Sequence, residues 1–290
     1  MTRDPTAGEA DGTDGPGLSP SEQRRAVRER YGTLAGEAGE DGCCGGTDAD
    51  AAAASSCGDG SPSGSRALGY ADDEVDSVAP GADLGLGCGN PTALAALEPG
   101  QTVLDLGSGG GFDCLLAGQE VGPDGHVIGV DMTPEMIERA RANVERNDAD
   151  TVEFRLGEIE HPPVADGTVD VVISNCVVNL SPDKPQVLRE AFRVLRPGGH
   201  LAISDVVLTA PLPDEIRADP TSVAACVAGA VPAPELEAML ADAGFRDVSV
   251  EPTDGDATFV RDWDPERDLR DYVVPATIEA EKPATGGADA

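Results

Sequence analysis

The stretch TVLDLGSGGGFDCLLA, residues 102–117, decides the fold of this 290-residue chain. Its first five residues are mostly apolar and predict a buried strand, after which glycines and then an apolar run typical of a helix follow. Glycines permit a tight turn and let a ligand approach the backbone closely. The sequence GVD at 129–131 ends in Asp131, 26 residues after Asp105, and suits the hydroxyl pair of a ribose. The stretch therefore predicts a strand–turn–helix unit that binds a nucleoside cofactor.

The charge beside the glycine turn helps to identify that cofactor. A dinucleotide would lay its pyrophosphate at the helix N-terminus, where the carboxylate of Asp105 would repel it. Counting G-x-G-x-x-G from Gly107 also puts Phe112 at the third glycine position. S-adenosylmethionine carries an ammonium and a sulfonium, which a carboxylate attracts. The residues therefore favour S-adenosylmethionine as the cofactor. The alternative is that this stretch is an ordinary glycine-rich turn between strand and helix that binds no ligand.

Outward from this unit, short apolar strands alternate with amphipathic helices. Strands are expected over 102–106, 127–130, 152–156, 169–174 and 201–207, with late strands over 246–251 and 272–281. Helices are expected over 112–119, 134–147 and 183–195, and over most of 211–245. Two of them have an N-cap followed by proline, at Thr133-Pro134 and Ser181-Pro182, and the turn PGG at 197–199 leads into the fifth strand. The pattern predicts an α/β fold with a doubly wound, mostly parallel seven-stranded sheet and helices on both faces.

The segment before this core is poor in apolar residues. Residues 1–18 are expected to be disordered. The capping box SPSE at 19–22 predicts a short helix through Arg30. Residues 32–66 are rich in Gly, Ala, Ser and Asp and are expected to form a mobile loop. We therefore divide the chain into an N-terminal segment 1–65, a cofactor-binding core 66–210 and a C-terminal capping region 211–290.

The net charge excludes whole classes of partner. The chain has 54 acidic and 20 basic residues, a formal charge of −34. Nucleic acids and anionic lipids need a basic surface, so we expect neither nucleic acid nor a membrane as a partner. No run approaches the ~18 apolar residues of a membrane helix, and residues 1–5 lead into no apolar signal segment. We expect a cytoplasmic protein with the acidic surface of a halophilic cell, where salt screens the repulsion.

Three of the seven cysteines fall where the predicted fold gathers ligands. In a reducing cytoplasm we expect thiols for chemistry or ligation rather than structural disulfides. Cys176 follows the strand 169–174, at the edge where α/β sheets bind ligands. Cys88 lies in a glycine-bracketed turn 17 residues before Asp105, and Cys226 lies in the segment expected to cap the crevice. We therefore expect these three sulfurs to converge, and the lack of CxxC spacing argues against a zinc ribbon.

Residues 100–206 resemble the class I S-adenosylmethionine-dependent methyltransferases, through the glycine turn, its strand and the acid that ends the second strand. The resemblance implies a Rossmann-like fold. Asp105 would lie near the methionyl ammonium and Asp131 on the ribose, while Met132 and Glu158 would lie beside the adenine. The cofactor-binding residues implied in this way are Asp105, Gly107, Ser108, Gly109, Asp131, Met132, Glu158 and Asn175.

From about residue 66 to its end, the chain closely resembles the arsenite methyltransferases. This resemblance is carried by LGLGCGNP at 84–91, the glycine turn at 105–113, VDMTPEM at 130–136, SNCVVNLSPDK at 174–184 and CVAGA at 226–230. It implies arsenite as the substrate, with As(III) bound by Cys88, Cys176 and Cys226. In the family an N-terminal cysteine can form a disulfide with the first arsenic-binding cysteine, and here Cys43, Cys44 and Cys57 all qualify. Methylation formally oxidises arsenic, so electrons must be returned, and they would come from a thiol reductant, thioredoxin or a small thiol.

Methyl transfer to thiolate-bound arsenic is chemically coherent. As(III) is soft and selects thiolates, and three thiolates leave its lone pair free to attack the methyl carbon. Arsenic carries no proton, so no general base is needed, and positioning and desolvation must supply most of the acceleration.

Two other functions stay open. A C- or O-methyltransferase for a quinone precursor would leave the three cysteines unexplained and would need an aromatic-lined pocket, although the chain has five Phe, three Tyr and one Trp. A non-enzymatic thiol module that sequesters As(III) would have no need of the glycine turn or of Asp131. Cys114, on the first predicted helix, is expected to be a small buried hydrophobe.

Overall fold

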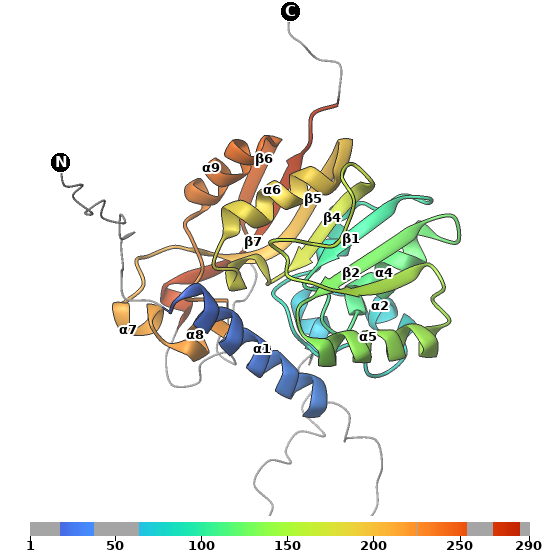
Figure 1. Cartoon of the computed structure of the whole chain (residues 1–290), viewed down its shortest axis with the longest axis horizontal. Helices are drawn as coiled ribbons and strands as arrows, with labels where there is room; N and C mark the ends of the chain where they lie inside the picture. The colour runs from blue at the N-terminus through green and yellow to red at the C-terminus, as the bar shows by residue number, and fades with distance from the viewer. Residues whose placement is uncertain (1–17, 38–63, 225, 254–268, 285–290) are drawn as a thin grey trace, which may run out of the picture.

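A seven-stranded sheet organises the computed structural model, which describes residues 18–37, 64–224, 226–253 and 269–284 (Figure 1). The strand order is β3-β2-β1-β4-β5-β7-β6. Strands β1 to β5 pair in parallel, and β7 runs antiparallel to both its neighbours. The doubly wound, mostly parallel sheet is therefore confirmed. Its strands are β1 Thr102–Leu106, β2 His126–Asp131, β3 Val152–Leu156, β4 Val169–Asn175, β5 Leu195–Leu208, β6 Arg246–Pro252 and β7 Val273–Glu281.

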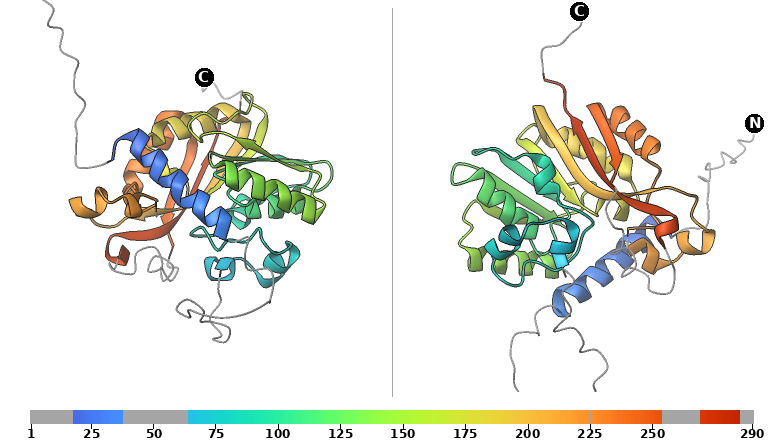
Figure 2. Two further views of the ribbon diagram at one scale, coloured as in Figure 1. Left: turned by 60° about the horizontal axis from the view of Figure 1, so that its bottom comes forward. Right: turned by 180° about the vertical axis from the view of Figure 1, so that it is seen from behind.

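Both faces of the sheet are buried because side chains alternate along each strand. On β1, Leu104 and Leu106 pack into the cluster that includes Leu188 and Leu240 of helices α6 and α9, and Val103 packs into the cluster on the opposite face with Ile137 of α5. Figures 1 and 2 show α6 and α9 together on one face. The principal helices are α3 Pro91–Ala95, α4 Phe112–Val121, α5 Pro134–Asn147, α6 Lys184–Val194 and α9 Ala233–Ala243.

Helix α1, Pro20–Glu37, is longer than the sequence predicted. Its capping box is confirmed, because the Ser19 backbone N–H donates to Glu22 Oε2 at 2.9 Å and the Glu22 N–H donates to Ser19 Oγ at 3.4 Å. The expected end at Arg30 is wrong: the helix continues to Glu37, and Ala35 in this added part is buried. Figures 1 and 2 show α1 crossing between α5 and α8, Pro220–Ala224. Tertiary packing therefore extends a helix of weak amphipathic character.

Two boundaries in the second half of the sheet also differ from expectation. Strand β5 already begins at Leu195, which pairs with Val169, and the segment PGG forms an irregularity inside this strand rather than a turn before it. The N-cap of α6 is Asp183, whose side chain accepts from the Gln186 N–H at 3.0 Å, instead of Ser181. In both places the predicted feature, a strand start or a helix cap, is present, but it lies a few residues from the predicted position.

Short helices rather than long ones fill the remainder of the described chain. They are η1 Gly64–Leu68, α2 Asp72–Ser77, η2 Val178–Leu180, α7 Asp214–Arg217 and η4 Leu269–Asp271. Strands β6 and β7 form the far edge of the sheet as expected. Among the described residues, the longest helices lack the length and apolarity needed to span a bilayer.

Candidate active site

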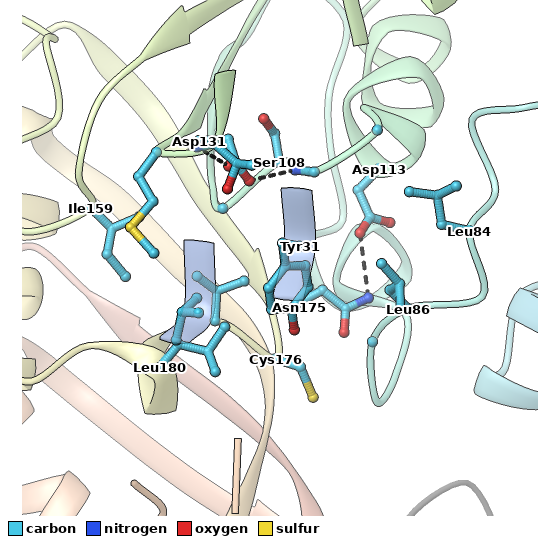
Figure 3. A pocket seen from close by; sticks show the side chains of 18 of the residues that line it. Tyr31, Leu84, Leu86, Ser108, Asp113, Asp131, Ile159, Asn175, Cys176 and Leu180 are labelled. Carbon is cyan, nitrogen blue, oxygen red and sulfur yellow. Dashed lines mark hydrogen bonds between the residues drawn. The ribbon is translucent and has the colours of Figure 1, made fainter. Parts of the chain in front are cut away.

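A pocket opens at the carboxyl ends of β1 to β4, where the strand order reverses between β1 and β4 (Figure 3). Loops that follow parallel strands meet at this edge, which is where open α/β sheets bind ligands. Helix α1 contributes Arg24, Val27 and Tyr31 to the wall. The pocket thus lies between the sheet edge and a helix from the N-terminal segment.

The glycine turn after β1 forms the floor of the pocket. The N–H groups of Gly107 and Ser108 both donate to the Val130 carbonyl, at 2.8 and 3.0 Å, and so fix the turn against β2. Gly107 has φ +77, and a Cβ there would lie 2.3 Å from Val177. Gly109 has φ +50 and open space around its missing Cβ. The turn therefore needs glycine for its backbone at one position and presents free volume at the other.

Polar groups in this part of the pocket have capacity left for a ligand. Asp131 accepts from the Gly109 N–H at 3.0 Å and from the Thr133 N–H at 2.8 Å, and burial raises the pKa of its carboxyl. Carboxylate oxygens have further lone pairs, so Asp131 is able to accept ribose hydroxyls. The Ser108 hydroxyl is buried without a hydrogen-bond partner in the described structure. It lies against Gly129 of β2 and is covered by protein atoms, so the ligand-facing polar group here is Asp131.

The carboxylate of the first strand is sealed in the core. Asp105 is 2% exposed and accepts from the Cys114 thiol at 3.2 Å, with a pKa raised well above its ordinary value by burial. It is absent from the pocket wall, and Asp113 of α4 lines the pocket instead. Burial raises the pKa of Asp113 to about 6. Its place in the first turn of the helix after the glycines was the signal that sequence reasoning missed.

The loop after β3 connects the sheet to helix α1. Glu158 pairs with Arg24 at 3.4 Å and with Arg28 at 3.9 Å and does not line the main pocket. Ile159 and Glu160 line it together with Met132. The second residue after β3 thus holds α1, and the next two line the cavity.

Helix α1 is fastened to the sheet through Glu160. The Glu160 carboxylate, 3% exposed, accepts from Ser181 Oγ at 2.7 Å and pairs with Arg24 Nη2 at 3.2 Å. The Gln23 amide adds a hydrogen bond to the Leu180 carbonyl at 3.0 Å. These contacts hold the helix across the pocket mouth, a function that the sequence around residue 20 did not reveal.

The three cysteines Cys88, Cys176 and Cys226 are all buried in one cluster beside the pocket. Cys88 and Cys176 form a disulfide with a Cα–Cα distance of 5.9 Å. The Cys226 thiol donates to the Cys176 carbonyl at 2.6 Å. The convergence agrees with the sequence expectation, but the expectation of three unpaired thiols differs from the structure, because two of the sulfurs are close enough to bond.

Both Cys176 and Cys226 have an unusual backbone conformation. Their φ angles are +55° and +66°, in the left-handed region that residues with a Cβ seldom occupy. Such outliers persist where surrounding structure fixes them, and they cluster at functional sites. Here the Cys176 N–H donates to the Ser204 carbonyl at 2.8 Å, which anchors the turn after β4.

An acid and a base lie next to the sulfurs. A carboxylate oxygen of Asp205 and the sulfurs of Cys88 and Cys176 all lie within 4.8 Å of one another. Burial raises the pKa of Asp205 to about 6, and Asn179 donates to its carboxylate from both backbone and side chain. Burial lowers the pKa of Lys184, which interacts electrostatically with Asp205 and Cys226. Sequence reasoning did not single out Asp205, Asn179 or Lys184.

The remaining cysteines separate into two groups. Cys114 is fully buried in the face packed by α4 and α5, as expected, although its thiol also donates to Asp105. The proposed redox cysteines Cys43, Cys44 and Cys57 lie outside the described residues.

The Methyltransferase domain family matches residues 97–247, from before β1 to the beginning of β6. An arsenite methyltransferase from Halobacterium salinarum is 61% identical over 267 residues, which cover 91% of this chain and 68% of that protein. Another from Aquipseudomonas alcaligenes is 46% identical over 168 residues, 56% of this chain and 48% of that protein. A solved arsenic(III) S-adenosylmethionine methyltransferase from Chlamydomonas reinhardtii has a TM-score of 0.55 and 33% identity, covering 78% of this chain and 76% of that one.

Proposed function

Because this chain belongs to the arsenite methyltransferase family, we propose that it transfers a methyl group from S-adenosylmethionine to As(III) bound by Cys88, Cys176 and Cys226. One observation carries the proposal. Cys176 lines the pocket formed by the glycine turn, and it also lies in the buried cluster with the other two cysteines. A substrate on these sulfurs would therefore adjoin the cofactor, as methyl transfer requires.

The pocket residues fit S-adenosylmethionine, which supplies a methyl carbon bonded to a cationic sulfur. Asp131 would accept the ribose hydroxyls, with Met132 and Ile159 against the adenine. Asp113 would receive the methionyl ammonium, because it is the carboxylate that lines the pocket beside the turn. Asp105 and Glu158 would support this site from outside the pocket wall.

Arsenic binding requires thiolates and therefore a reductant. Two electrons and two protons from a thiol reductant, thioredoxin or a small thiol, would convert the Cys88–Cys176 disulfide to two thiols, with the reductant leaving as a disulfide. Three soft sulfurs would then hold As(III) with its lone pair exposed. The lone pair would attack the methyl carbon, S-adenosylhomocysteine would leave, and two further electrons from the thiol reductant would return the formally oxidised arsenic to As(III). Cys43, Cys44 and Cys57 are the candidates for an N-terminal redox partner. This chemistry suits the cytoplasm, where thiols are kept reduced.

The three parts of the chain divide this work in our proposal. Residues 66–210 would bind the cofactor and supply two of the sulfurs, and residues 211–290 would bring the third over the substrate. Helix α1 of the segment 1–65 would close the cofactor pocket through Arg24 and Tyr31. The last two strands, although assigned to the capping region, complete the same sheet.

The test is incubation of the reduced chain with arsenite, S-adenosylmethionine carrying a deuterated methyl group, and a thiol. We expect methylated arsenicals with three deuterium atoms in mass spectra, and no more than a single turnover when the thiol is omitted. Binding of S-adenosylmethionine without any methylated arsenic would contradict the proposal. Arsenite binding with no heat of S-adenosylmethionine binding in calorimetry would instead indicate a sequestering module.

A further inference from the structure

The side-chain amide of Asn175 contacts both halves of the site. It belongs to the last residue of β4, immediately before Cys176. Its oxygen accepts from the Cys88 N–H at 3.0 Å, and its nitrogen donates to the Gly89 carbonyl at 2.8 Å. The same nitrogen donates its second hydrogen to the Tyr70 hydroxyl at 3.0 Å and lies 3.4 Å from a carboxylate oxygen of Asp113 beside it (Figure 3). One planar amide therefore connects the Tyr70–Asp113 pair on the cofactor side to the backbone of a cysteine in our proposed arsenic site.

The turn that carries Cys88 is shaped to receive this amide. Gly87 has φ +130, and a Cβ there would lie 2.7 Å from the oxygen of Asn175. A Cβ on Gly89 would lie 2.8 Å from Ser204 Oγ of β5. The turn thus packs backbone against Asn175 on one side and against the sheet on the other. Because Cys88 lies outside any helix or strand, its position depends on these contacts.

On the cofactor side, the amide belongs to a buried polar ring. The Tyr70 hydroxyl, in a residue 5% exposed, donates to Asp113 Oδ1 and accepts from the Asn175 nitrogen at 3.0 Å. An ionised Asp113 has only acceptors, so it takes the Tyr70 proton and leaves the Tyr70 oxygen to accept from Asn175, which favours the orientation with the amide nitrogen on this side. That orientation is the one in which the amide oxygen reaches the Cys88 N–H.

We propose that Asn175 is a positioning residue through which a cationic group at Asp113 and arsenite at Cys88 strengthen each other's binding. A cation at Asp113 stabilises the carboxylate, the carboxylate orders the amide, and the amide fixes the Cys88 turn. Turning the amide over would bring its oxygen against Asp113 and break the bond to Cys88. The inference rests on the proposed function and adds to it a coupling between the two ligands.

Thermodynamic linkage makes the coupling measurable from either ligand. If the cofactor raises arsenite affinity by some factor, arsenite must raise cofactor affinity by the same factor. S-adenosylhomocysteine carries the ammonium without a transferable methyl group, so both ligands stay unreacted. Methylthioadenosine keeps the nucleoside and lacks the ammonium. The difference between these two probes reports the amino-acid part that carries the ammonium, and the variants at Asn175 and Tyr70 assign the effect to the contact with Asp113.

The experiment is calorimetric titration of the reduced full-length chain with arsenite, alone and with saturating amounts of either nucleoside. For the wild-type chain we expect S-adenosylhomocysteine to tighten arsenite binding about tenfold and methylthioadenosine to leave it within about twofold. In Asn175→Asp the Cys88 N–H keeps an acceptor, but the carboxylate faces Asp113, so both ligands still bind and the factor falls toward one. Tyr70→Phe keeps the ring packing on Phe112 and lowers the factor partially.

The matched control is Asn147→Ala, which removes another bridging amide. Asn147 accepts from the Ala79 N–H and donates to the Asn143 carbonyl, away from both halves of the site, and this variant should keep the wild-type factor. An unchanged factor in Asn175→Asp and Tyr70→Phe, or equal coupling by methylthioadenosine, would overturn the inference. A wild-type chain that binds both ligands without coupling would also overturn it. A wild-type chain that binds no arsenite would instead contradict the proposed function.

Discussion

The cofactor half and the thiol half of the site are built in different ways. The cofactor half uses residues that adjoin one another in sequence, at 107–113 and 131–133, and backbone hydrogen bonds to Val130 and Asp131 fix them. The thiol half joins Cys88 to Cys176 across 88 residues, and Cys226 arrives from 50 residues further on. Local structure forms the first half, whereas the second exists only when the whole chain has folded.

The two halves also differ in their backbone conformation and in their covalent bonds. The cofactor turn has glycines wherever the backbone is left-handed, so no side chain opposes its shape. The thiol half places non-glycine residues, Cys176 and Cys226, in the same region and contains a disulfide that would have to open before these sulfurs could bind arsenic as we propose. A change in one half should therefore leave binding of a single ligand to the other half largely intact when its co-ligand is absent, and the following variants test that separation.

Loss of a sulfur should have the largest effect. Cys176→Ser replaces a soft ligand by a hard hydroxyl, so we expect arsenite methylation to fall below about one-thousandth of the wild-type rate. Binding of S-adenosylmethionine should stay within about twofold, because the cofactor turn is untouched. The control is Cys114→Ser, a buried thiol outside the arsenic cluster that should retain activity. Normal methylation by Cys176→Ser would show that this sulfur is no ligand.

A side chain in the glycine turn should have the next largest effect, and this effect should be on cofactor binding. Gly109→Leu places a side chain in the pocket, and we expect affinity for S-adenosylhomocysteine to fall at least about tenfold, or 1.4 kcal/mol. Arsenite affinity without nucleoside should not change. Gly167→Leu has a similar φ of +62° and equally open space, but it is exposed far from the pocket, so it controls for backbone strain. Equal losses in the two variants would place Gly109 outside the binding surface.

The pH dependence of cofactor binding should identify the carboxylate that meets the ammonium. Burial raises the pKa of Asp113 to about 6, so this group is ionised above that pH and becomes protonated as the pH falls through it. A cation binds the ionised form, and affinity for S-adenosylhomocysteine should therefore weaken up to about tenfold for each unit below pH 6. Asp113→Asn should bind weakly at every pH with a flat profile between pH 5 and 7. A wild-type slope that survives in this variant would assign the ammonium to another group.

The smallest effect is expected where α1 joins the two halves. Arg24→Ala removes ion pairs to Glu158 and Glu160, and partly exposed pairs contribute about 0.2–1 kcal/mol. The KM for S-adenosylmethionine should rise up to about fivefold with little change in kcat. Arg25→Ala is the control, because Arg25 is exposed on the same helix and pairs only with Glu29 among the described residues. A similar KM in both variants would show that Arg24 does not contribute to binding of S-adenosylmethionine.

The same division explains how much of the molecule could be predicted from sequence. The strand before Gly107, the turn itself and the acid at Asp131 are local patterns, and the structure has them at the expected positions. The mostly parallel sheet with helices on both faces follows from the strand–helix alternation. The end of α1 could not be predicted, because it depends on Ala35 packing against distant parts of the chain.

Side-chain placement within the site was less predictable than its location. The carboxyl edge rule brought Cys88, Cys176 and Cys226 to one region, but it could not say which two sulfurs would bond. Nor could it say that Asp113 of α4 would line the pocket while Asp105 of β1 is sealed in the core, because the packing of α4 on β1 decides which carboxyl is covered. The bridging amide of Asn175 depends on three segments at once and has no sequence signature of its own.

The most direct test of the central claim is X-ray absorption at the arsenic edge, measured on the reduced chain with one equivalent of arsenite and saturating S-adenosylhomocysteine. The account predicts three sulfur neighbours around arsenic and no oxygen, with one sulfur lost in Cys226→Ser. Oxygen in the arsenic shell of the wild-type chain, or three sulfurs that persist in Cys226→Ser, would contradict it.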